Sequence, residues 1–568
     1  MPPKRPDAKF DDEPTEECER SIRTEPDGPD ADDVGLSCRA DLDFPPRFQN
    51  RSIVMLEALP PDLRDRTRRL NRRRLSSRQR ESAAYVMVWL RQALRGFDNP
   101  ILDAAIAIAD DIGKPVLVYH GLDNRYPYAN HRLHRFALQA SRTLQTDVLD
   151  RGLSFVRFVR RPDHRGPNRI RMLAEHAAVV LTDDLAIFDT VRWARSVAAQ
   201  IDRPMFAVDA ACLVTESHFD RHHATTRGFR SAHTPLRTAA MNETADVPVP
   251  KSIRKPLVDP PPSDELPKTD AALDRMIGRC GVDMTVPPAS DFAGDRRTAL
   301  NRLNHAIVDV LPRYKWTRNN PSLDESSSRL SPYFHFGVLG PREATIAIHA
   351  ADLHSAARWK FLDEMLTWRE YYHHRGRHVA DWSRYESLPA YARQTLDDHR
   401  DDSRPHLYSI GQLIRGETDD TVWNAAQRQF TLDGWMHNNL RMVWVKQILR
   451  WTPSPESAFA TACYLNDRFS LDGRDASTYG GIRWGFGESR PGYREIDVYG
   501  KVPPKSSSAL MKRSGVNAWV EQMNQRPVGK IATDQFARSR RYSACDLTPD
   551  LRSMVKASGE VSIAPQKK

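Results

Sequence analysis

The segment Tyr85-Val-Met-Val-Trp-Leu90 decides the fold, together with Asn99–Ile112 and Pro115–His120, which follow it. The first and third segments are short apolar runs rich in β-branched residues, which is typical of buried strands. The middle segment is amphipathic with helical spacing. A strand, a helix and a second strand in this order predict the start of a parallel α/β sheet.

The same alternation continues to residue 215. Further strands are expected at Leu153–Val159, Ala177–Leu181 and Met205–Val208, and further helices at His131–Asp147 and Ala186–Ile201. We therefore predict a doubly wound, mostly parallel sheet over residues 83–215, with helices on both faces. Such sheets bind ligands at the carboxyl ends of their strands, although a Gly-rich dinucleotide fingerprint is missing here.

The pattern changes to helical spacing from about residue 293 to residue 480, which predicts an all-helical domain over 293–530. Within it, Ser454 and Pro455 are an N-cap followed by a first-turn proline, so a helix should run from there to about Asp467. Residues 216–292 are rich in Pro, Thr and charged groups. They are expected to form an interdomain linker without long helices.

Composition restricts the class of protein. The 568 residues are too many for one ordinary core, and 40% hydrophobic with 28% charged residues is typical of soluble globular proteins. The chain has no apolar run long enough to cross a bilayer, and the N-terminus has no secretory signal, so a cytoplasmic protein without a membrane partner is expected. Residues 1–48 are predicted to be a disordered acidic tail and residues 531–568 a basic flexible tail.

The formal net charge of +10 suits a polyanionic partner, although ordinary enzymes also carry such a charge. The six cysteines are scattered and include no C-x-x-C pair. This spacing predicts neither a metal site nor a disulfide framework.

A run of hydroxyl groups stands in Ser326-Ser-Ser-Arg-Leu-Ser-Pro-Tyr-Phe-His-Phe-Gly337. Its proline can open a helix, and free N–H groups at a helix start attract anions, so the run is a candidate phosphate cradle. An isolated run of this kind would more often be a simple capping turn.

This string resembles the FAD pyrophosphate-binding string of the photolyase family. Three more segments resemble the class II branch of that family, in the same order and spacing: Val422–Gln427, His437–Trp444 and Leu465–Asp475. The resemblance extends over residues 83 to about 500. It implies a monomeric carbon–carbon lyase that binds FAD and uses light to split cyclobutane pyrimidine dimers in double-stranded DNA.

The resemblance also implies an FAD site. Contacts to the phosphates are expected from Tyr314, Ser328, Leu330 and Ser331. Contacts to the flavin ring are expected from an Arg441–Asp472 ion pair over the ring, from Asp475 at the ring imide and from Asn466 at N5. The alternative for Arg441 and Asp472 is a plain structural salt bridge.

Glu364 and Trp368 are four residues apart and should share one helix face. Alone, such a pair would usually be a solvated rim beside a buried ring, but the resemblance implies a catalytic lesion pocket that also includes Met442 and Trp484. Glu364 would hydrogen-bond the dimer as negative charge develops on it. The two indole rings would stack on the flipped-out bases.

Trp444 and Trp451 are seven residues apart on one predicted helix, and Trp423 precedes Trp444 by 21 residues. Buried tryptophans usually belong to a core. The resemblance implies instead an electron-transfer chain that reduces the flavin under light, with Trp444 innermost, Trp423 next and Trp451 outermost.

Five arginines near these motifs are candidate contacts to DNA phosphates: Arg468, Arg474, Arg483, Arg490 and Arg494. A charge run is otherwise a solvated face. Because phosphate contacts release counterions, the affinity for DNA should fall steeply with salt.

The chain departs from the family pattern in two places. Val502–Ser508 replaces a basic and aromatic segment, and Trp89–Asp98 is only similar to the start of the family's α/β domain. The class implies a deazaflavin-type antenna, and the second departure leaves an empty antenna site as the alternative.

Two other functions fit parts of the sequence. One is a cryptochrome-like light sensor with the same fold and FAD, and the acidic N-terminus favours it. The other is a DNA-binding protein with a vestigial flavin fold. Retention of the lesion-pocket residues argues against a sensor, and retention of Arg441, Asp472 and the Ser328–Ser331 string argues against a vestigial fold.

Overall fold

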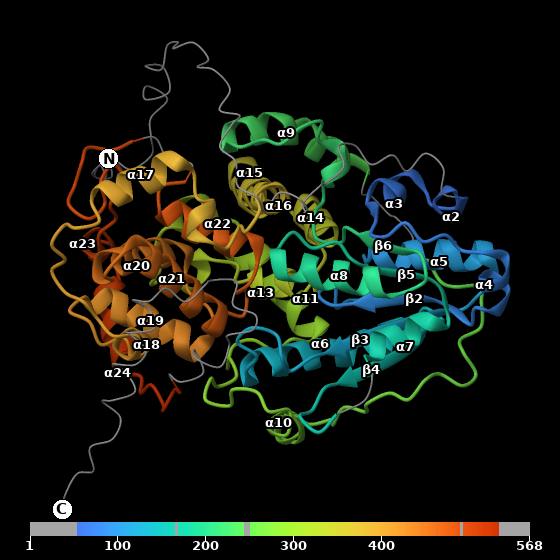
Figure 1. The fold of residues 1–568 in the computed structure, drawn as a ribbon. Helices are drawn as coiled ribbons and strands as arrows, with labels where there is room; N and C mark the ends of the chain where they lie inside the picture. Colours follow the sequence, from blue (N-terminus) through green and yellow to red (C-terminus); the bar gives the residue numbers. More distant parts are fainter. Residues whose placement is uncertain (1–53, 165–167, 244–249, 489–491, 533–568) are drawn as a thin grey trace, which may run out of the picture. The chain divides into compact units, whose positions relative to one another are not determined.

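The computed structural model describes residues 54–164, 168–243, 250–488 and 492–532 (Figure 1). The predicted acidic tail and, apart from residues 531 and 532, the predicted basic tail lie outside this part of the chain. None of the helices in the described ranges is long and apolar enough to span a membrane.

One six-stranded sheet has the order β1-β6-β5-β2-β3-β4. Its strands are β1 (Thr67–Arg69), β2 (Tyr85–Leu90), β3 (Val116–Leu122), β4 (Ser154–Val159), β5 (Ala177–Asp183) and β6 (Met205–Val208). All neighbours are parallel except β1, which pairs antiparallel with β6. The predicted α/β sheet is therefore confirmed, with β1 as an additional edge strand.

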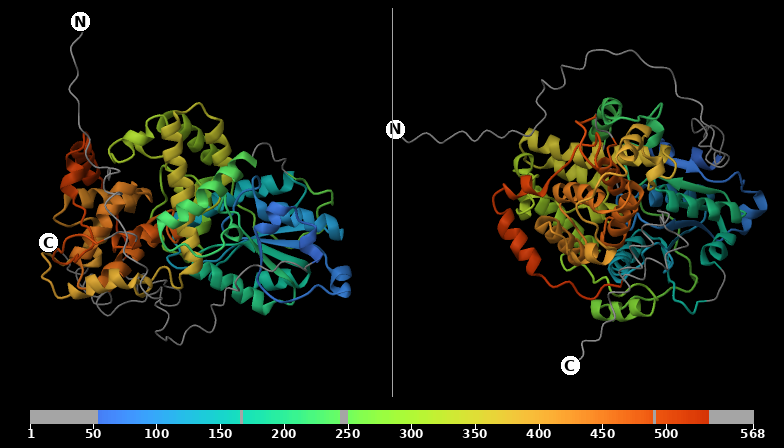
Figure 2. Two further views of the ribbon diagram at one scale, coloured as in Figure 1. Left: turned by 90° about the horizontal axis from the view of Figure 1, so that it is seen from above. Right: turned by 60° about the vertical axis from the view of Figure 1, so that its left-hand side comes forward.

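Helices cover both faces of the sheet. Alternate residues of the central strand β2 point to opposite faces, so each face of the sheet has its own apolar core. Val86 and Val88 join one apolar core with α5 (Pro100–Ile112) and α6 (His131–Asp150). Tyr85 and Met87 join another core with α7 (Arg169–Glu175) and α8 (Phe188–Gln200). Figures 1 and 2 show this layered part beside the helical part.

The described chain after β6 forms helices, which confirms the predicted all-helical domain type. The remaining elements are α2 (Val54–Glu57), α3 (Pro61–Asp65), α4 (Ser77–Ser82), η2 (Glu216–His218), α9 (Thr226–Glu243), α10 (Asp270–Gly278), α11 (Arg296–His305), η3 (Ala306–Val310), α12 (Tyr314–Thr317), η4 (Asp324–Ser326), α13 (Ser331–His335), α14 (Pro341–Ala350), α15 (Ser355–Leu362), η5 (Asp363–Trp368), α16 (Arg369–His378), η6 (Tyr385–Ser387), α17 (Ala390–Asp398), α18 (Ile410–Arg415), α19 (Thr421–Asp433), α20 (Asn438–Trp451), α21 (Pro455–Phe469), α22 (Ala476–Gly485), α23 (Ser507–Met511) and α24 (Val516–Gln525). The predicted cap of α21 is confirmed, since the Ser454 side chain accepts from the Ser457 N–H.

The expectation that residues 216–292 contain no long helix is wrong. Helix α9 has 18 residues and includes Pro235, which would disfavour a helix on local grounds. Tertiary packing stabilises it: Phe229 is fully buried with its ring 5.5 Å from that of Tyr371. Arg237 also donates to the Thr367 hydroxyl at 2.7 Å.

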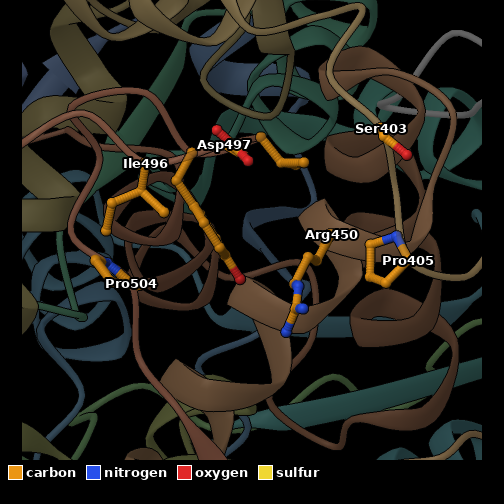
Figure 3. A pocket seen from close by; sticks show the side chains of 8 residues that line it. Ser403, Pro405, Arg450, Ile496, Asp497 and Pro504 are labelled. Atoms are coloured by element: carbon orange, nitrogen blue, oxygen red, sulfur yellow. The ribbon is translucent and has the colours of Figure 1, made fainter.

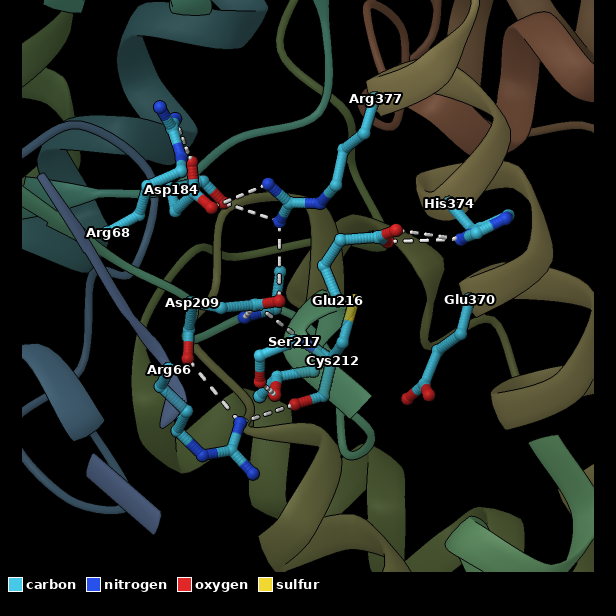
Figure 4. A network of polar contacts seen from close by, with 12 residues as sticks. Arg66, Arg68, Asp184, Asp209, Cys212, Glu216, Ser217, Glu370, His374 and Arg377 are labelled. Atoms are coloured by element: carbon cyan, nitrogen blue, oxygen red, sulfur yellow. Dashed lines mark hydrogen bonds and ion pairs between the residues drawn. The ribbon is translucent and has the colours of Figure 1, made fainter. Parts of the chain in front are cut away.

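An ion-pair network joins the sheet to α16 (Figure 4). Arg377 of α16 bridges two carboxylates at the ends of adjacent strands, Asp184 at 2.6 Å and Asp209 at 3.2 Å. Arg68 of β1 adds a second ion pair to Asp184 at 2.6 Å. Burial alone would raise the pKa of Asp184, but the charges of Arg377 and Arg68 hold it well below its ordinary value. The network therefore fixes the end of the sheet against the helical part.

Replacing Asp184 by Asn should lower the free energy of unfolding by about 3–5 kcal/mol, because two buried guanidinium groups lose their carboxylate. Since the carboxyl pKa is depressed in the folded state, the stabilisation is present above about pH 4 and is lost as the pH falls further. Urea unfolding at several pH values measures this. Asp202→Asn is the control, because Asp202 is 72% exposed and pairs only loosely with Arg73. Equal stability of Asp184→Asn and wild type at pH 7 would contradict the expectation.

Beside this network, Glu216, His374 and His378 lie close enough together to hold a metal ion. Both ring nitrogens of His374 are already used in hydrogen bonds. The Nε2 atom of His374 accepts from the His223 backbone N–H, so Nδ1 carries the proton and donates to Glu216 at 3.1 Å. His374 therefore offers no free lone pair, and these residues form a second hydrogen-bonded link between η2 and α16.

Candidate functional site

A buried ion pair lies at the centre of the candidate site. Arg441 of α20 lies with its Nη2 atom 3.2 Å from Oδ1 of Asp472, which follows α21. Burial would raise the pKa of Asp472, but the charge of Arg441 and hydrogen bonds from Ser331 and Ser470 lower it. The predicted pair is thus present, and its carboxylate is held in the ionised form.

The Ser326–Gly337 string reaches this ion pair. Ser331, the first residue of α13, hydrogen-bonds Asp472, although the two residues are 141 positions apart in the sequence. Ser331 is exposed, Ser328 is half-buried and Leu330 is buried. Ser331 therefore links the exposed start of α13 to the buried pair.

Tyr314, the other predicted phosphate contact, packs against α15. It is half-buried on α12, and its ring meets that of Phe361 edge-on at 5.1 Å. Burial raises the pKa of its hydroxyl well above the ordinary value, so the group stays protonated and able to donate.

Asp475 caps α22 and binds a histidine that the sequence reasoning did not single out. Its Oδ2 atom is 3.1 Å from Nδ1 of His335, which stands inside the Ser326–Gly337 string. Burial would raise the pKa of Asp475, but the hydrogen bond to His335 and the nearby His373 hold it far below the usual range.

Several buried polar atoms around Asp475 have no hydrogen-bond partner among the described residues. They include both ring nitrogens of His373 and the hydroxyl of Ser477. Because an unsatisfied buried polar atom is costly, such a group usually binds water, an ion or a ligand. These orphaned atoms, together with the Arg441–Asp472 pair, fit a polar cofactor.

Asn466 of α21 lies next to the ion pair but is already engaged. Its Oδ1 atom accepts from Arg441 at 3.4 Å. Its Nδ2 atom donates to Asp467 at 3.0 Å and to Thr478 at 3.4 Å. Asn466 therefore lies beside Arg441 with its amide oriented by protein groups, and its contact with flavin N5 stays a prediction.

Glu364 and Trp368 both lie on η5, a π-helical turn between α15 and α16. Both side chains are half-buried. The Glu364 carboxylate binds Arg318 and Lys360, each at 3.1 Å. π-Helical turns occur frequently at functional sites, and this one carries the two predicted lesion contacts.

Met442 and Trp484 are half-buried on α20 and α22. Two glycines of α22 permit close packing there: a Cβ at Gly480 would clash with the Tyr372 ring, and a Cβ at Gly481 would lie 3.6 Å from Met442. Tyr372 in turn contacts the Trp368 ring at 6.1 Å. Helix α22, which carries Trp484, therefore packs closely against Met442 of α20 and against Tyr372, the neighbour of Trp368.

The three predicted electron-transfer tryptophans form a continuous buried row. The Trp423 and Trp444 rings are stacked, 6.4 Å apart and 4° from parallel. The Trp423 and Trp451 rings meet edge-on at 5.3 Å. The order of contact is the predicted one, and every ring is at most 4% exposed.

Two residues of this row were missed. The Phe430 ring lies 5.5 Å from the Arg441 guanidinium carbon and 5.8 Å from the Trp444 ring, so it joins the row to the ion pair. Gln427 accepts from the Trp444 Nε1–H at 2.8 Å. The Val422–Gln427 segment already contained Gln427, whereas nothing in the sequence distinguishes Phe430 from ordinary core.

Two of the five predicted DNA contacts are wrong. Arg468 is 1% exposed and pairs with Asp283 at 2.7 Å, and Arg483 is fully buried over the Trp382 ring at 4.0 Å. Both hold the helical core together, because a buried guanidinium needs nearby acceptors. Arg474 is half-buried over Tyr126, Arg494 is exposed, and Arg490 lies outside the described residues.

A cavity of about 550 Å³ lies apart from these residues (Figure 3). Its lining is Ser403, Pro405, Arg450, Ile496, Asp497, Val498, Tyr499 and Pro504. No predicted site residue belongs to it. One lining residue, Pro504, belongs to the Val502–Ser508 segment, where the sequence departs from the family pattern.

The fold is that of photolyases and cryptochromes. The chain is similar to a class III photolyase from Agrobacterium tumefaciens, with a TM-score of 0.55 and 17% identity over 84% of this chain and 98% of that one. A cryptochrome from Synechocystis gives 0.54 and 16% over 84% and 99%. An archaeal photolyase from Sulfolobus tokodaii, solved with two FAD molecules, gives 0.53 and 16%.

Curated relatives carry the name deoxyribodipyrimidine photo-lyase. The chain is 29% identical to the one from Methanothermobacter thermautotrophicus over 449 residues, 78% of this chain and 94% of that protein. It is 38% identical to the one from Potorous tridactylus over 223 residues, 39% and 42% of the two chains. No protein-family model matches the chain. The predicted resemblance to photolyases is confirmed, and the predicted enzyme class is the one these relatives share, while the class II branch stays a prediction.

Proposed function

We propose that this protein is a class II DNA photolyase that binds FAD and repairs cyclobutane pyrimidine dimers in double-stranded DNA under light. The observation that carries the proposal is the continuity of the site. A buried tryptophan row leads through Phe430 to Arg441 of the Arg441–Asp472 pair, and Ser331 of the Ser326–Gly337 string hydrogen-bonds Asp472 of the same pair.

The residues fit FAD in their donor and acceptor chemistry. The hydroxyls of Ser328, Ser331 and Tyr314 would bind the phosphates, and Leu330 would pack beneath them. Arg441 and Asp472 would set the charge at the ring edge, while Asp475 would accept from the ring imide. Reduced FAD, when bound and illuminated, supplies the electron that dimer splitting needs.

The chain's own groups would bind and polarise the lesion. Trp368, Trp484 and Met442 offer half-buried flat or apolar surfaces to the two linked bases of a dimer flipped out of the duplex. Glu364, positioned by Arg318 and Lys360, would donate a hydrogen bond from its carboxylic acid form to the dimer carbonyl where negative charge develops, because the ionised carboxylate only accepts. No net redox change is required, since the electron returns after the bonds open.

The loop after β2 is fixed to the end of β5 at the switch point of the sheet. There the Asp183 carboxylate accepts from the backbone N–H groups of Arg91, Gln92 and Ala93 at 2.6–3.2 Å. Sheets of this kind bind ligands at the switch point. A deazaflavin-type antenna, which the class implies, stays the proposal for a second chromophore, with an empty antenna site as the alternative.

The protein would act as a cytoplasmic monomer, and exposed Arg494 remains a proposed contact to DNA phosphates. The test is illumination of the reduced, FAD-loaded protein with an oligonucleotide that carries one cyclobutane thymine dimer. Recovery of thymine absorbance in light, and none in a dark sample, is expected. No recovery from protein that contains FAD would contradict repair and favour the cryptochrome-like sensor. Protein without flavin absorption would favour the vestigial fold.

A further inference from the structure

Two tryptophans are unusually exposed on adjacent helices. Trp316 of α12 is 62% exposed and Trp359 of α15 is 53% exposed, whereas indole rings are normally well buried. The two helices are in contact, since Tyr314 packs edge-on against Phe361 at 5.1 Å. The Trp316 ring also lies 6.0 Å from that of His354. We call Trp316, Trp359 and His354, with the cations around them, the α12–α15 surface.

This surface is positively charged. The segments Pro312–Asn319 and Leu353–Leu362 contain five lysines or arginines and no carboxylate: Arg313, Lys315, Arg318, Arg358 and Lys360. Arg313 and Lys315 are exposed, and the other three are half-buried. Arg318 and Lys360 share the Glu364 carboxylate, so the positive charge of the surface comes mainly from Arg313, Lys315 and Arg358. A cationic surface with exposed aromatic rings matches the chemistry of a nucleic-acid strand, in which anionic phosphates alternate with flat bases.

The α12–α15 surface borders the proposed lesion pocket. Arg318 lies immediately after α12 and Lys360 lies on α15, and both bind the Glu364 carboxylate at 3.1 Å. Trp316 is two residues from Arg318, and Trp359 is next to Lys360. A strand whose dimer enters the pocket at Glu364 would therefore pass close to both indole rings.

We propose that Trp316 and Trp359 stack on unpaired nucleotides of the DNA strand beside the dimer, while Arg313 and Lys315 contact their phosphates. This rests on the proposed function. When the dimer leaves the helix, neighbouring bases lose part of their stacking, and an aromatic ring replaces it without regard to sequence. The surface therefore selects locally opened strands over intact duplex.

The test measures the affinity of the FAD-loaded protein for three DNAs in the dark: a single-stranded oligonucleotide with one dimer, a duplex with one dimer and an undamaged duplex. The double variant Trp316→Ala with Trp359→Ala should bind the single-stranded dimer about 10- to 100-fold more weakly. The undamaged duplex should bind equally to both proteins. Lys315→Ala should lower the slope of log affinity against log salt for the single strand by about 0.7.

Two controls make the result specific. Trp316→Phe with Trp359→Phe keeps flat rings and should retain most of the affinity. Leu407→Ala removes a 59% exposed apolar side chain elsewhere and should change nothing. Unchanged affinity of the Ala double variant, with wild type still preferring dimer DNA, would overturn this inference alone and leave the surface to a protein partner. A wild type without any preference for dimer DNA would instead overturn the proposed function.

Discussion

Replacing Trp423 by Phe should abolish the light-driven reduction of oxidised FAD and leave dimer repair by chemically reduced protein intact. Trp423 is the middle ring of the row, in contact with Trp444 at 6.4 Å and with Trp451 at 5.3 Å. A phenyl ring fills most of the same space but is far harder to oxidise than an indole. Electron transfer along the row would therefore stop at this position.

The measurement is the loss of the oxidised-flavin absorbance under blue light, with a thiol present as external reductant. Trp382→Phe is the matched control, since Trp382 is also buried and its Nε1–H also donates to a backbone carbonyl, that of Ala476 at 3.1 Å. It lies outside the row and should leave photoreduction unchanged. Photoreduction at the normal rate in Trp423→Phe would show that electrons reach the flavin by another route.

Replacing Glu364 by Ala should lower the repair yield between about 10- and 100-fold while FAD stays bound. The carboxyl group would no longer be present to stabilise negative charge on the dimer. Glu364→Gln should lose less, because its amide still donates a hydrogen bond. Repair per absorbed photon at saturating DNA is compared with the flavin content of each variant.

Glu343→Ala is the control for this series. Glu343 is likewise part-buried and ion-paired, with Arg296 at 2.5 Å, but it lies on α14 and has no proposed contact with DNA. Its loss should not reduce the repair yield. A yield that is unchanged in Glu364→Ala would remove Glu364 from the mechanism and leave it as a partner of Arg318 and Lys360.

The parallel sheet could be predicted because its strands are apolar on both faces and therefore appear as uninterrupted apolar runs. Strands β2 and β6 have the predicted bounds. Strand β1 could not be predicted, since Thr67-Arg-Arg69 is polar and pairs only because β6 offers an open edge. Helix α9 was missed for the opposite reason: its local sequence disfavours a helix, and distant residues stabilise it.

Within the site, the motifs predicted correctly which residues are in contact. They predicted less well which side chains are exposed to solvent. Arg441 and Asp472, and the three tryptophans, meet as expected. Arg468 lies in the Leu465–Asp475 motif and Arg483 follows it by a few residues, yet Arg468 is buried against the Asp283 carboxylate and Arg483 against the Trp382 carbonyl, both from distant segments. The exposure of an arginine depends on such tertiary partners, and a single sequence does not reveal them.

The π-helical turn η5 has a consequence for how this chain tolerates changes in length. α15, η5 and α16 follow one another without a break, and a π-turn contains one residue more than an α-helical turn. Deleting one residue between Asp363 and Trp368 would let the turn relax to regular α-helix with little rotation of the chain after it, because the deletion removes the one extra residue. Arg377 would then still face Asp184 and Asp209. A single-residue deletion should therefore disturb folding less here than in the surrounding helices, where it would rotate everything after it by about 100°. Its cost should fall instead on the placement of Glu364 and Trp368.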